Sequence, residues 1–356
     1  MNEDLDNSLC LTANIKKGEN IRRVIKSLGL FNELYKIETI NNKILIPITR
    51  DLSSREKKQI KDIDPYFIIT NYSFKKRKKR VSNFRDYLLQ KVDPNYIKFL
   101  PKSFDTIGNI AIIEIPEVIK KYDKLIGNAI IKTFKSIRTV YSKKSIVSGK
   151  FRIRKLELIG GIDNPITIHK ENGCLFELDV KKVYFSPRLS TERLRVVKQV
   201  RNNEKIIDMF AGVGTYSIQI AKKRDVEIIA FDINPNAINY FEKNIILNKV
   251  HSIKLILGNV SNNITKFKNF ADRVIMNLPK TSFNYLKDAC QLISKNGGII
   301  NYYQFISNEQ KISDITNKIT DEIKRNNRIL KETIFYKKVK DISPKKSQFA
   351  FDIKII

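Results

Sequence analysis

The sequence predicts an α/β protein in which two smaller α+β domains precede a doubly wound, Rossmann-like sheet. Short apolar runs alternate with helical stretches from about residue 181 onward, as parallel strands joined by helices would do. Two strand patterns separated only by a short turn close the chain. The length of 356 residues allows two or three domains with cores of their own.

The first predicted domain spans residues 1–70. An apolar segment, a helical stretch ended by a glycine and a run with strand-like alternation follow one another. These elements are Leu9–Ile15, Glu19–Leu28 and Lys43–Thr49. A basic linker is predicted over residues 71–84, where six consecutive Lys and Arg side chains follow Phe74. Such a run is usually solvated, and it is also able to bind phosphates.

The second predicted domain, residues 85–180, is α+β and is expected to bind RNA. A short apolar strand, Ala111–Ile115, precedes a helical stretch over Ile119–Phe134. The segment Tyr141–Arg154 interleaves basic and aromatic residues, which favours an RNA-facing loop. The pattern of Ile166–Glu177 predicts two strands around a Glu-Asn-Gly turn.

The third predicted domain spans residues 181–356. Apolar runs predict parallel strands at Lys205–Phe210, Glu227–Asp232, Ile253–Leu257, Asp272–Met276 and Gly298–Tyr303. Helices are predicted between them at Thr215–Lys223, Pro235–Asn248 and Ser282–Ser294. A closing hairpin is predicted from Leu330–Val339 and Gln348–Ile356. A hairpin at the end of a mostly parallel sheet is the layout of a class I methyltransferase domain.

The charge of the chain predicts a polyanionic partner. Sixty-seven Lys and Arg residues against 37 Asp and Glu residues give a formal net charge of +30. The sequence is also rich in Ile and Asn, so the codon bias of an AT-rich genome explains part of the surplus. Because no strongly amphipathic basic helix is evident, we expect nucleic acid and no membrane as the partner.

Composition also excludes several classes of protein. No stretch approaches 18 uncharged apolar residues, which argues against a transmembrane helix. Three widely spaced cysteines predict no disulfide framework, and together with only two histidines they predict no metal site. The acidic start of the chain lacks the order of a secretory signal. We therefore expect a cytoplasmic protein.

A glycine turn follows the first predicted parallel strand. In Asp208–Gly214 the glycines let backbone N–H groups approach a ligand closely. The spacing does not fit a dinucleotide fingerprint, which would require glycine at Ala211 and Ser217. Asp208 ends an apolar strand, so we expect it to contact a ligand instead of lying buried and unpaired.

Two further strand ends carry polar side chains. Asp232 ends the second strand, where a carboxylate can accept hydrogen bonds from both hydroxyls of a ribose. The alternative is a role at the helix N-terminus before Pro235, with Asn234 as the cap. Asn277–Pro279 ends the fourth strand, where adenine- and guanine-directed methyltransferases carry a short Asn- or Asp-Pro-Pro element. The alternative here is an ordinary strand-ending turn.

The chain resembles the archaeal and eukaryotic tRNA (guanine-37-N1)-methyltransferases. The residues that carry the resemblance lie in order between residues 104 and 303, and residues 1–70 resemble the additional domain of the longer archaeal forms. The matching segments are Phe104–Asn109, His169–Cys174, Val183–Arg193, Asp208–Gly214, Asp232–Pro235, Asn244–Asn248 and Met276–Pro279. Ordinary methyltransferases lack the combination of Val183–Arg193 with Asp208–Gly214.

The resemblance implies methyl transfer from S-adenosylmethionine to N1 of guanine 37, on the 3′ side of the anticodon. N1 carries a proton at neutral pH, so a base must remove it and donors must meet the charge that moves to O6. The resemblance assigns the base to Glu192, the donor near O6 to Arg152 and the orientation of the guanine to Asn277. The residue pattern alone leaves Glu192 as a helix partner of Arg195, and Arg152 as a phosphate contact.

The resemblance also implies a set of cofactor-binding residues. They are Tyr184, Phe185, Arg188, Arg193, Asp208, Gly212, Gly214, Asp232, Ile233, Asn259, Val260, Asn277, Leu278 and Pro279. The chain departs from the family pattern at Asn259, where an aspartate is usual, at Asn301, where a histidine is frequent, and at Thr215-Tyr216, where Pro-Phe is frequent. None of these departures removes a catalytic group. His169 and Cys174 are expected to be structural.

The partner implied is a tRNA with guanine at position 37, bound by a monomer. One alternative is the wyosine-pathway aminocarboxypropyl transferase, which uses the same cofactor on the same fold. Glu192 and an intact Asn277–Pro279 favour methyl transfer over that reaction. A second alternative is a non-catalytic tRNA-binding protein, against which the complete set of motifs argues.

Overall fold

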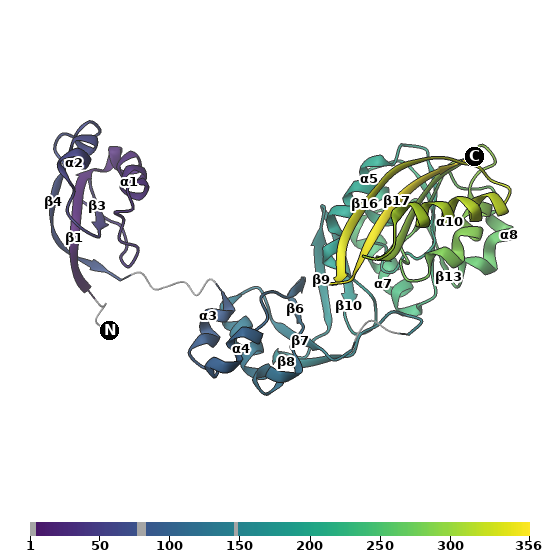
Figure 1. The fold of residues 1–356 in the computed structure, drawn as a ribbon, viewed down its shortest axis with the longest axis horizontal. Coiled ribbons are helices and arrows are strands. Elements are labelled where there is room, and N and C mark those ends of the chain that lie inside the picture. The colour runs from purple at the N-terminus through teal and green to yellow at the C-terminus, as the bar shows by residue number, and fades with distance from the viewer. Residues whose placement is uncertain (1–4, 77–82, 146–148) are drawn as a thin grey trace. The chain divides into compact units, whose positions relative to one another are not determined.

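A computed structural model describes residues 5–76, 83–145 and 149–356 of the chain (Figure 1). It divides into two compact units, Met1–Ser82 and Asn83–Ile356. In the described ranges no helix is both long enough and apolar enough to cross a membrane.

The N-terminal unit contains an antiparallel sheet in the order β2-β3-β1-β4 together with short helical elements. The strands are β1 (Leu5–Asn14), β2 (Glu38–Ile40), β3 (Lys43–Ile48) and β4 (Ile68–Lys75), and the helices are the 3₁₀ helix η1 (Ile15–Lys17), α1 (Gly18–Ser27) and α2 (Ser54–Lys61). Apolar residues at helical spacing on α1, Ile21 and Ile25, pack against Leu11 and Ile46 of the sheet. The predicted helix and the strand-like run of this domain are confirmed as α1 and β3, and most of the apolar segment Leu9–Ile15 belongs to β1.

The predicted linker over residues 71–84 begins too early. Residues 71–75 belong to β4, which pairs along most of β1. Phe74 is fully buried and packs edge-on against Tyr72, so the aromatic residue before the basic run is part of the core. The sequence gives little signal for this strand, because Phe74 is the one fully buried residue in it. The rest of the run, residues 77–80, lies outside the described residues.

The second predicted domain contains a mixed sheet in the order β5-β6-β7-β8. Its elements are α3 (Phe84–Leu89), η2 (Pro94–Phe99), β5 (Asp105–Ile107), β6 (Ile110–Ile113), η3 (Glu117–Tyr122), α4 (Asp123–Thr133), β7 (Thr139–Lys143) and β8 (Leu156–Gly161). The predicted helix over Ile119–Phe134 is divided between η3 and α4. Tyr141 of the expected RNA-facing loop is instead buried in β7 and donates a hydrogen bond to Asp163.

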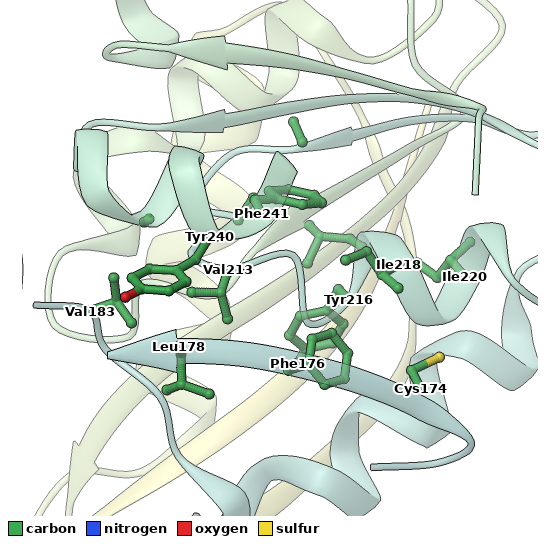
Figure 2. Close-up of a cluster of buried hydrophobic side chains, with 14 of the residues drawn as sticks. Cys174, Phe176, Leu178, Val183, Val213, Tyr216, Ile218, Ile220, Tyr240 and Phe241 are labelled. Atoms are coloured by element: carbon green, nitrogen blue, oxygen red, sulfur yellow. The ribbon is translucent and has the colours of Figure 1, made fainter. Parts of the chain in front are cut away.

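The predicted hairpin is present as β9 (Ile166–Glu171) and β10 (Cys174–Asp179). Asn172 and Gly173 both have positive φ, 50° and 85°, as a two-residue hairpin turn of this twist requires. Cys174, Phe176 and Leu178 of β10 point into the core of the third domain, toward Tyr216 and Phe241 (Figure 2). The hairpin therefore packs with the third domain, and the predicted boundary at residue 180 is wrong.

Two asparagines hold the free edge of this hairpin against the third domain. Asn248 accepts from the N–H of Leu175 at 2.9 Å and donates to its carbonyl at 2.7 Å. Asn244 makes the same pair of bonds with Glu177, at 2.7 and 3.1 Å. Each amide thus pairs with the strand edge as a further strand would, because a carboxamide offers the same donor and acceptor as a peptide group.

The third domain is built on a sheet in the order β13-β12-β11-β14-β15-β17-β16. The strands are β11 (Lys205–Asp208), β12 (Glu227–Asp232), β13 (Ile253–Leu257), β14 (Arg273–Met276), β15 (Gly298–Ser307), β16 (Leu330–Ser343) and β17 (Lys346–Ile355). β11 to β15 are parallel, whereas β16 and β17 form the antiparallel hairpin seen as the long yellow strands in Figure 1. This confirms the predicted class I methyltransferase layout.

Helices cover both faces of this sheet. The helical elements are η4 (Pro187–Leu189), α5 (Ser190–Gln199), α6 (Ser217–Ala221), α7 (Pro235–Asn248), η5 (Val260–Asn263), α8 (Ile264–Phe267), η6 (Ser282–Tyr285), α9 (Leu286–Leu292) and α10 (Ile312–Arg325). Alternate strand residues face different cores: Ile206 and Ile228 pack with α5, α6 and α7, and Ile207 and Ile229 pack with α8, α9 and α10. The structure adds α5, α8 and α10 to the helices that the sequence predicted.

Candidate active site

A cavity of about 500 Å³ lies at the carboxyl ends of the parallel strands. Its floor comes from the turns after β11, β12, β13 and β14, and its sides come from residues 149–152 and 184–193. In the sheet, β11 has β12 as its neighbour on one side and β14 as its neighbour on the other, so the direction of the strand order changes at β11. Such a switch point is where open α/β sheets bind their ligands.

The cavity brings together most of the predicted site residues. Those on its wall are Arg152, Tyr184, Phe185, Arg193, Gly212, Asp232, Ile233, Asn259, Val260, Asn277 and Leu278. Glu192, Arg188, Asp208, Gly214 and Pro279 are not on the wall. Within the described part of the chain, no group of three potential metal-binding side chains gathers.

The glycine turn shapes the cavity floor. Gly212 has a φ of 57°, and a Cβ built there would meet no atom within 4 Å. Gly214 has a φ of 88°, and a Cβ built there would lie 2.3 Å from the ring of Phe241 on α7. Gly212 therefore leaves open space beside the cavity, whereas Gly214 lets the turn pack against α7.

Asp232 is held in place by backbone donors at the end of β12. Its Oδ2 accepts from the N–H of Gly212 at 2.7 Å, and its Oδ1 accepts from the N–H of Asn234 at 2.8 Å. Asn234 itself caps α7 by accepting from Asn236 at 3.0 Å. A carboxylate has about four acceptor positions, so Asp232 keeps acceptor capacity facing the cavity. Burial raises the pKa of Asp232, and the backbone donors oppose that rise.

Asp208 lies behind the floor of the cavity and not on it. The side chain is fully buried, and Oδ2 accepts from the Ser217 hydroxyl at 2.7 Å. Burial raises the pKa of Asp208 to about 7, and the bond from Ser217 opposes the rise. The predicted ligand contact assumed that an aspartate would not be buried here, but a carboxyl group that is readily neutralised tolerates this position.

Arg152 enters the cavity wall from the loop after β7. Its guanidinium lies 4.8 Å from the centre of the Tyr184 ring, and its φ is 56°. Burial, with a smaller contribution from Arg154, lowers the pKa of Arg152. Lys340 of β16 approaches the same tyrosine and contacts Ser186 Oγ at 3.3 Å. Sequence reasoning missed Lys340, since it stands in a strand with several other lysines and outside every motif.

Arg193 joins several elements at the wall. It is 2% exposed and pairs with Glu171 of β9, with Nε–Oε1 at 2.6 Å. It also donates to the carbonyl of Ser186 at 3.0 Å, and its guanidinium lies 5.3 Å from the Phe185 ring. Arg188 instead turns away from the cavity and pairs with Asp105 of β5 at 2.6 Å.

The turn after β14 presents Asn277 and Leu278 to the cavity. Leu278 donates its N–H to the carbonyl of Met276 at 2.9 Å, which reverses the chain tightly. Pro279 lies behind the wall, where its carbonyl accepts from Phe305 of β15 at 3.0 Å. The segment is therefore both a strand-ending turn and a way of directing the Asn277 side chain at the cavity.

Glu192 lies in the first turn of α5, buried behind the wall that Leu189 and Arg193 form. Its carboxylate accepts from Arg195 at 2.7 and 2.9 Å and from the Tyr303 hydroxyl at 2.7 Å. The helix pair that the residue pattern suggested is therefore present. His169 has a structural position as expected, since its Nδ1 accepts from the N–H of Gly108 at 3.1 Å.

Comparison with known families matches the chain in three segments. Residues 167–330 match the TRM5/TYW2 methyltransferase domain, residues 84–164 match the TYW2 N-terminal domain, and residues 10–56 match the tRNA methyltransferase 5 N-terminal domain. The break between the first two lies just before β9, in agreement with the packing of the hairpin.

Curated relatives cover between 62% and 98% of the chain. It is 43% identical over 298 residues to the tRNA (guanine(37)-N(1))-methyltransferase Trm5b of Pyrococcus abyssi, covering 84% of each chain. It is 37% identical over 353 residues to the Trm5b of Methanocaldococcus jannaschii, covering 98% of each chain. It is 31% identical over 222 residues, 62% of this chain and 78% of the relative, to a tRNA(Phe) (4-demethylwyosine(37)-C(7)) aminocarboxypropyltransferase of Pyrococcus horikoshii.

Solved structures agree with these relatives. The crystal structure of wild-type Trm5b from Pyrococcus abyssi superposes with a TM-score of 0.80 and 37% identity, over 98% of this chain and 99% of that one. A complex of aTrm5 with tRNALeu gives a TM-score of 0.78 and 35% identity, over 98% of this chain and all of the other.

The two glycines of the turn are expected to respond differently to an added methyl group. Gly214→Ala should lower the free energy of unfolding by about 3 kcal/mol, because the left-handed backbone and the contact with Phe241 both oppose a Cβ. Gly212→Ala should cost only about 1 kcal/mol, since the backbone term acts alone. Urea unfolding followed by circular dichroism measures both, and equal losses would contradict the assignment of Gly214 to packing.

Proposed function

The chain belongs to the TRM5/TYW2 methyltransferase family, and on that premise we propose that it transfers a methyl group from S-adenosylmethionine to N1 of guanine 37 in tRNA. The observation that carries the proposal is one cavity at the switch point of the sheet. There a ribose acceptor, Asp232, lies on the same wall as two side chains suited to a guanine, Arg152 and Asn277.

The residues of the cavity fit S-adenosylmethionine. Open space beside Gly212 admits a ligand close to the backbone, and Asp232 offers its remaining acceptor positions to ribose hydroxyls. Asn259 presents a carboxamide after β13, where an adenine amino group would find an acceptor. When bound, the cofactor supplies a methyl group on a cationic sulfur, which needs no further activation.

The target guanine needs help that the chain itself supplies. Glu192 is the base that takes the proton from N1, and it is held one helical turn from the wall residue Leu189. Arg152, stacked on Tyr184, donates to the charge that develops on O6. Asn277 orients the base through its carboxamide. In the resting arrangement Glu192 faces Arg195 and Tyr303, so its carboxylate must turn toward the cavity for the proton transfer.

Aminocarboxypropyl transfer from the same cofactor is the second candidate, supported by the relative from Pyrococcus horikoshii. Tests of the two candidates use separate incubations of the enzyme with S-adenosylmethionine and either a tRNA transcript carrying guanine 37 or a tRNA carrying 4-demethylwyosine at that position, the nucleotide in the name of that relative. We expect guanine 37 to gain the mass of a methyl group, and a transcript with adenine at that position to gain nothing. The mass of an aminocarboxypropyl group would overturn the proposal.

The N-terminal unit is proposed to recognise tRNA away from the anticodon. It matches the N-terminal domain of tRNA methyltransferase 5 and forms a compact unit of its own. The basic residues that follow it, in a chain with a net charge of +30, would add phosphate contacts. We propose further that the enzyme acts as a monomer in the cytoplasm.

Glu192→Gln is expected to lower kcat for methylation by roughly 100-fold or more, because the amide cannot accept the N1 proton. The affinity for S-adenosylmethionine should stay nearly unchanged, since Glu192 is not on the cavity wall. Single-turnover kinetics and calorimetry measure the two effects. Lys198→Gln, an exposed change on the same helix, is the matched control. A rate for Glu192→Gln within about threefold of wild type would make this residue purely structural.

Asp232→Ala is expected to act on the cofactor alone. Loss of an acceptor for ribose hydroxyls should raise the KM for S-adenosylmethionine by about tenfold, as expected for bonds to a charged group worth about 1.5–3 kcal/mol. The KM for tRNA should barely move. Initial rates with each substrate varied separately make the comparison, and an equal rise in both constants would point to damage to the fold.

A further inference from the structure

One guanidinium is shared by two buried carboxylates behind the cavity wall. Arg195 donates to Glu192 through Nε to Oε2 at 2.9 Å and through Nη2 to Oε1 at 2.7 Å. The same group donates to Asp352 of β17 through Nη2 to Oδ1 at 3.1 Å, and also through Nη1 to Oδ2. Glu192 is 7% exposed and Asp352 is 2% exposed.

Other groups complete the surroundings of Glu192. Tyr303 of β15, fully buried, donates its hydroxyl to Oε1 at 2.7 Å. Its oxygen lies 3.1 Å from the hydroxyl of Tyr216, which precedes α6. The titratable and charged groups that face Glu192 are thus Arg195 from its own helix, Tyr303 from β15 and Tyr216 from the α6 side, with Asp352 from β17 acting through Arg195.

Asp352 is held firmly by neutral donors as well as by Arg195. Gln199 donates to its Oδ2 at 2.8 Å, and Asn301 donates to its Oδ1 at 2.6 Å. Asn301 accepts in turn from Arg273, which pairs with Glu204 at 2.8 Å. Since the amides of Gln199 and Asn301 carry no charge, Arg195 is the cation that directly contacts Asp352 among the described residues.

How strongly Arg195 holds Glu192 depends on the second carboxylate, Asp352, that the same guanidinium contacts. A guanidinium bonded to one buried carboxylate alone would stabilise that carboxylate in its charged form and in its present position. A second carboxylate on the same guanidinium weakens both effects, because the positive charge is divided between two anions. A base must both leave its resting partners and accept a proton, so it benefits from this weakening.

We propose that Asp352 is a positioning residue for the reaction: by sharing Arg195 it keeps Glu192 able to turn to the cavity and take the N1 proton. The inference rests on the proposed role of Glu192 as the base. In the step itself, the N1–H bond breaks and an O–H bond forms on the Glu192 carboxyl group. The electron pair stays on the guanine and is delocalised toward O6.

Asp352→Asn tests the inference, because it keeps the shape of the side chain and removes its charge. Glu192 is then the one carboxylate bonded to Arg195 among the described residues. We expect kcat to fall by about tenfold, with the KM values for tRNA and S-adenosylmethionine unchanged within about twofold. The acid-side midpoint of the rate profile should move to lower pH, since a carboxylate held more strongly in its charged form is protonated only at lower pH.

Glu204→Gln is the matched control. It removes the carboxylate that pairs with Arg273, and Arg273 donates to Asn301 at the other end of the same hydrogen-bond network. We expect a loss of thermal stability similar to that of Asp352→Asn, but kcat within about twofold of wild type and an unchanged pH profile. Equal effects of the two variants on kcat and on the profile would show that the network is only structural.

Tyr303→Phe gives a second test with the opposite sign. It removes one donor to Glu192 and leaves Asp352 and Arg195 in place, so the acid-side midpoint should move to higher pH. A shift in the same direction as that of Asp352→Asn, or no shift, would overturn the inference. Calorimetric binding of S-adenosylmethionine shows that each variant is folded.

The outcomes separate this inference from the proposed function. If Glu192→Gln keeps its rate, the assignment of the base fails, and the role of Asp352 fails with it. If Glu192→Gln is inactive while Asp352→Asn keeps both its rate and its pH profile, the base stands and only the inference is lost.

Discussion

The buried ion pair between Arg193 and Glu171 is the interaction on which the rest of the site depends. Both side chains are 2% exposed, and the β9–β10 hairpin, α5 and the 184–186 segment meet there. Gln219 of α6 also donates to Glu171, at 2.8 Å. Loss of either charge would leave the other one buried without the opposite charge that pairs with it, which costs about 3–5 kcal/mol. The pair therefore fixes the cavity wall relative to the sheet, and Phe185 and Tyr184 take their places from it.

The elements of the sheet could be predicted because alternate residues of each strand face different cores. Ile206 and Ile207, for example, pack with helices on different faces, so the apolar runs of the parallel strands carried a strong signal. β4 had no such signal, since few of its residues are buried. No signal in the sequence indicated that β10 is attached to the third domain. This attachment depends on the side-chain amides of Asn244 and Asn248, whose partners are backbone groups far away in the sequence.

The sequence predicted the site residues that follow the carboxyl ends of parallel strands. It did not predict which of these side chains would be buried behind the cavity. Asp232 and Asn277 reach the cavity because the carboxyl ends of parallel strands meet at one edge. Asp208 has the same kind of position in the sequence, yet it is buried beneath the turn, where Ser217 and a raised pKa make it tolerable. Lys340 approaches Tyr184 from β16, a strand whose register contains irregularities that no local pattern specifies.

Two groups of charged side chains near the cavity differ in their surroundings. On the side of Tyr184, Arg152 and Lys340 place two positive charges near the cavity, and these attract negative charge. Burial lowers the pKa of each group. Behind the wall that Leu189 and Arg193 form, the charges of Glu192, Arg195 and Asp352 are bonded to one another. A substrate that carries phosphates and develops charge on a base edge is matched by the first group. The proposed role of Glu192 as a base fits the second group, because its charge is paired with that of Arg195 until the carboxylate turns toward the cavity.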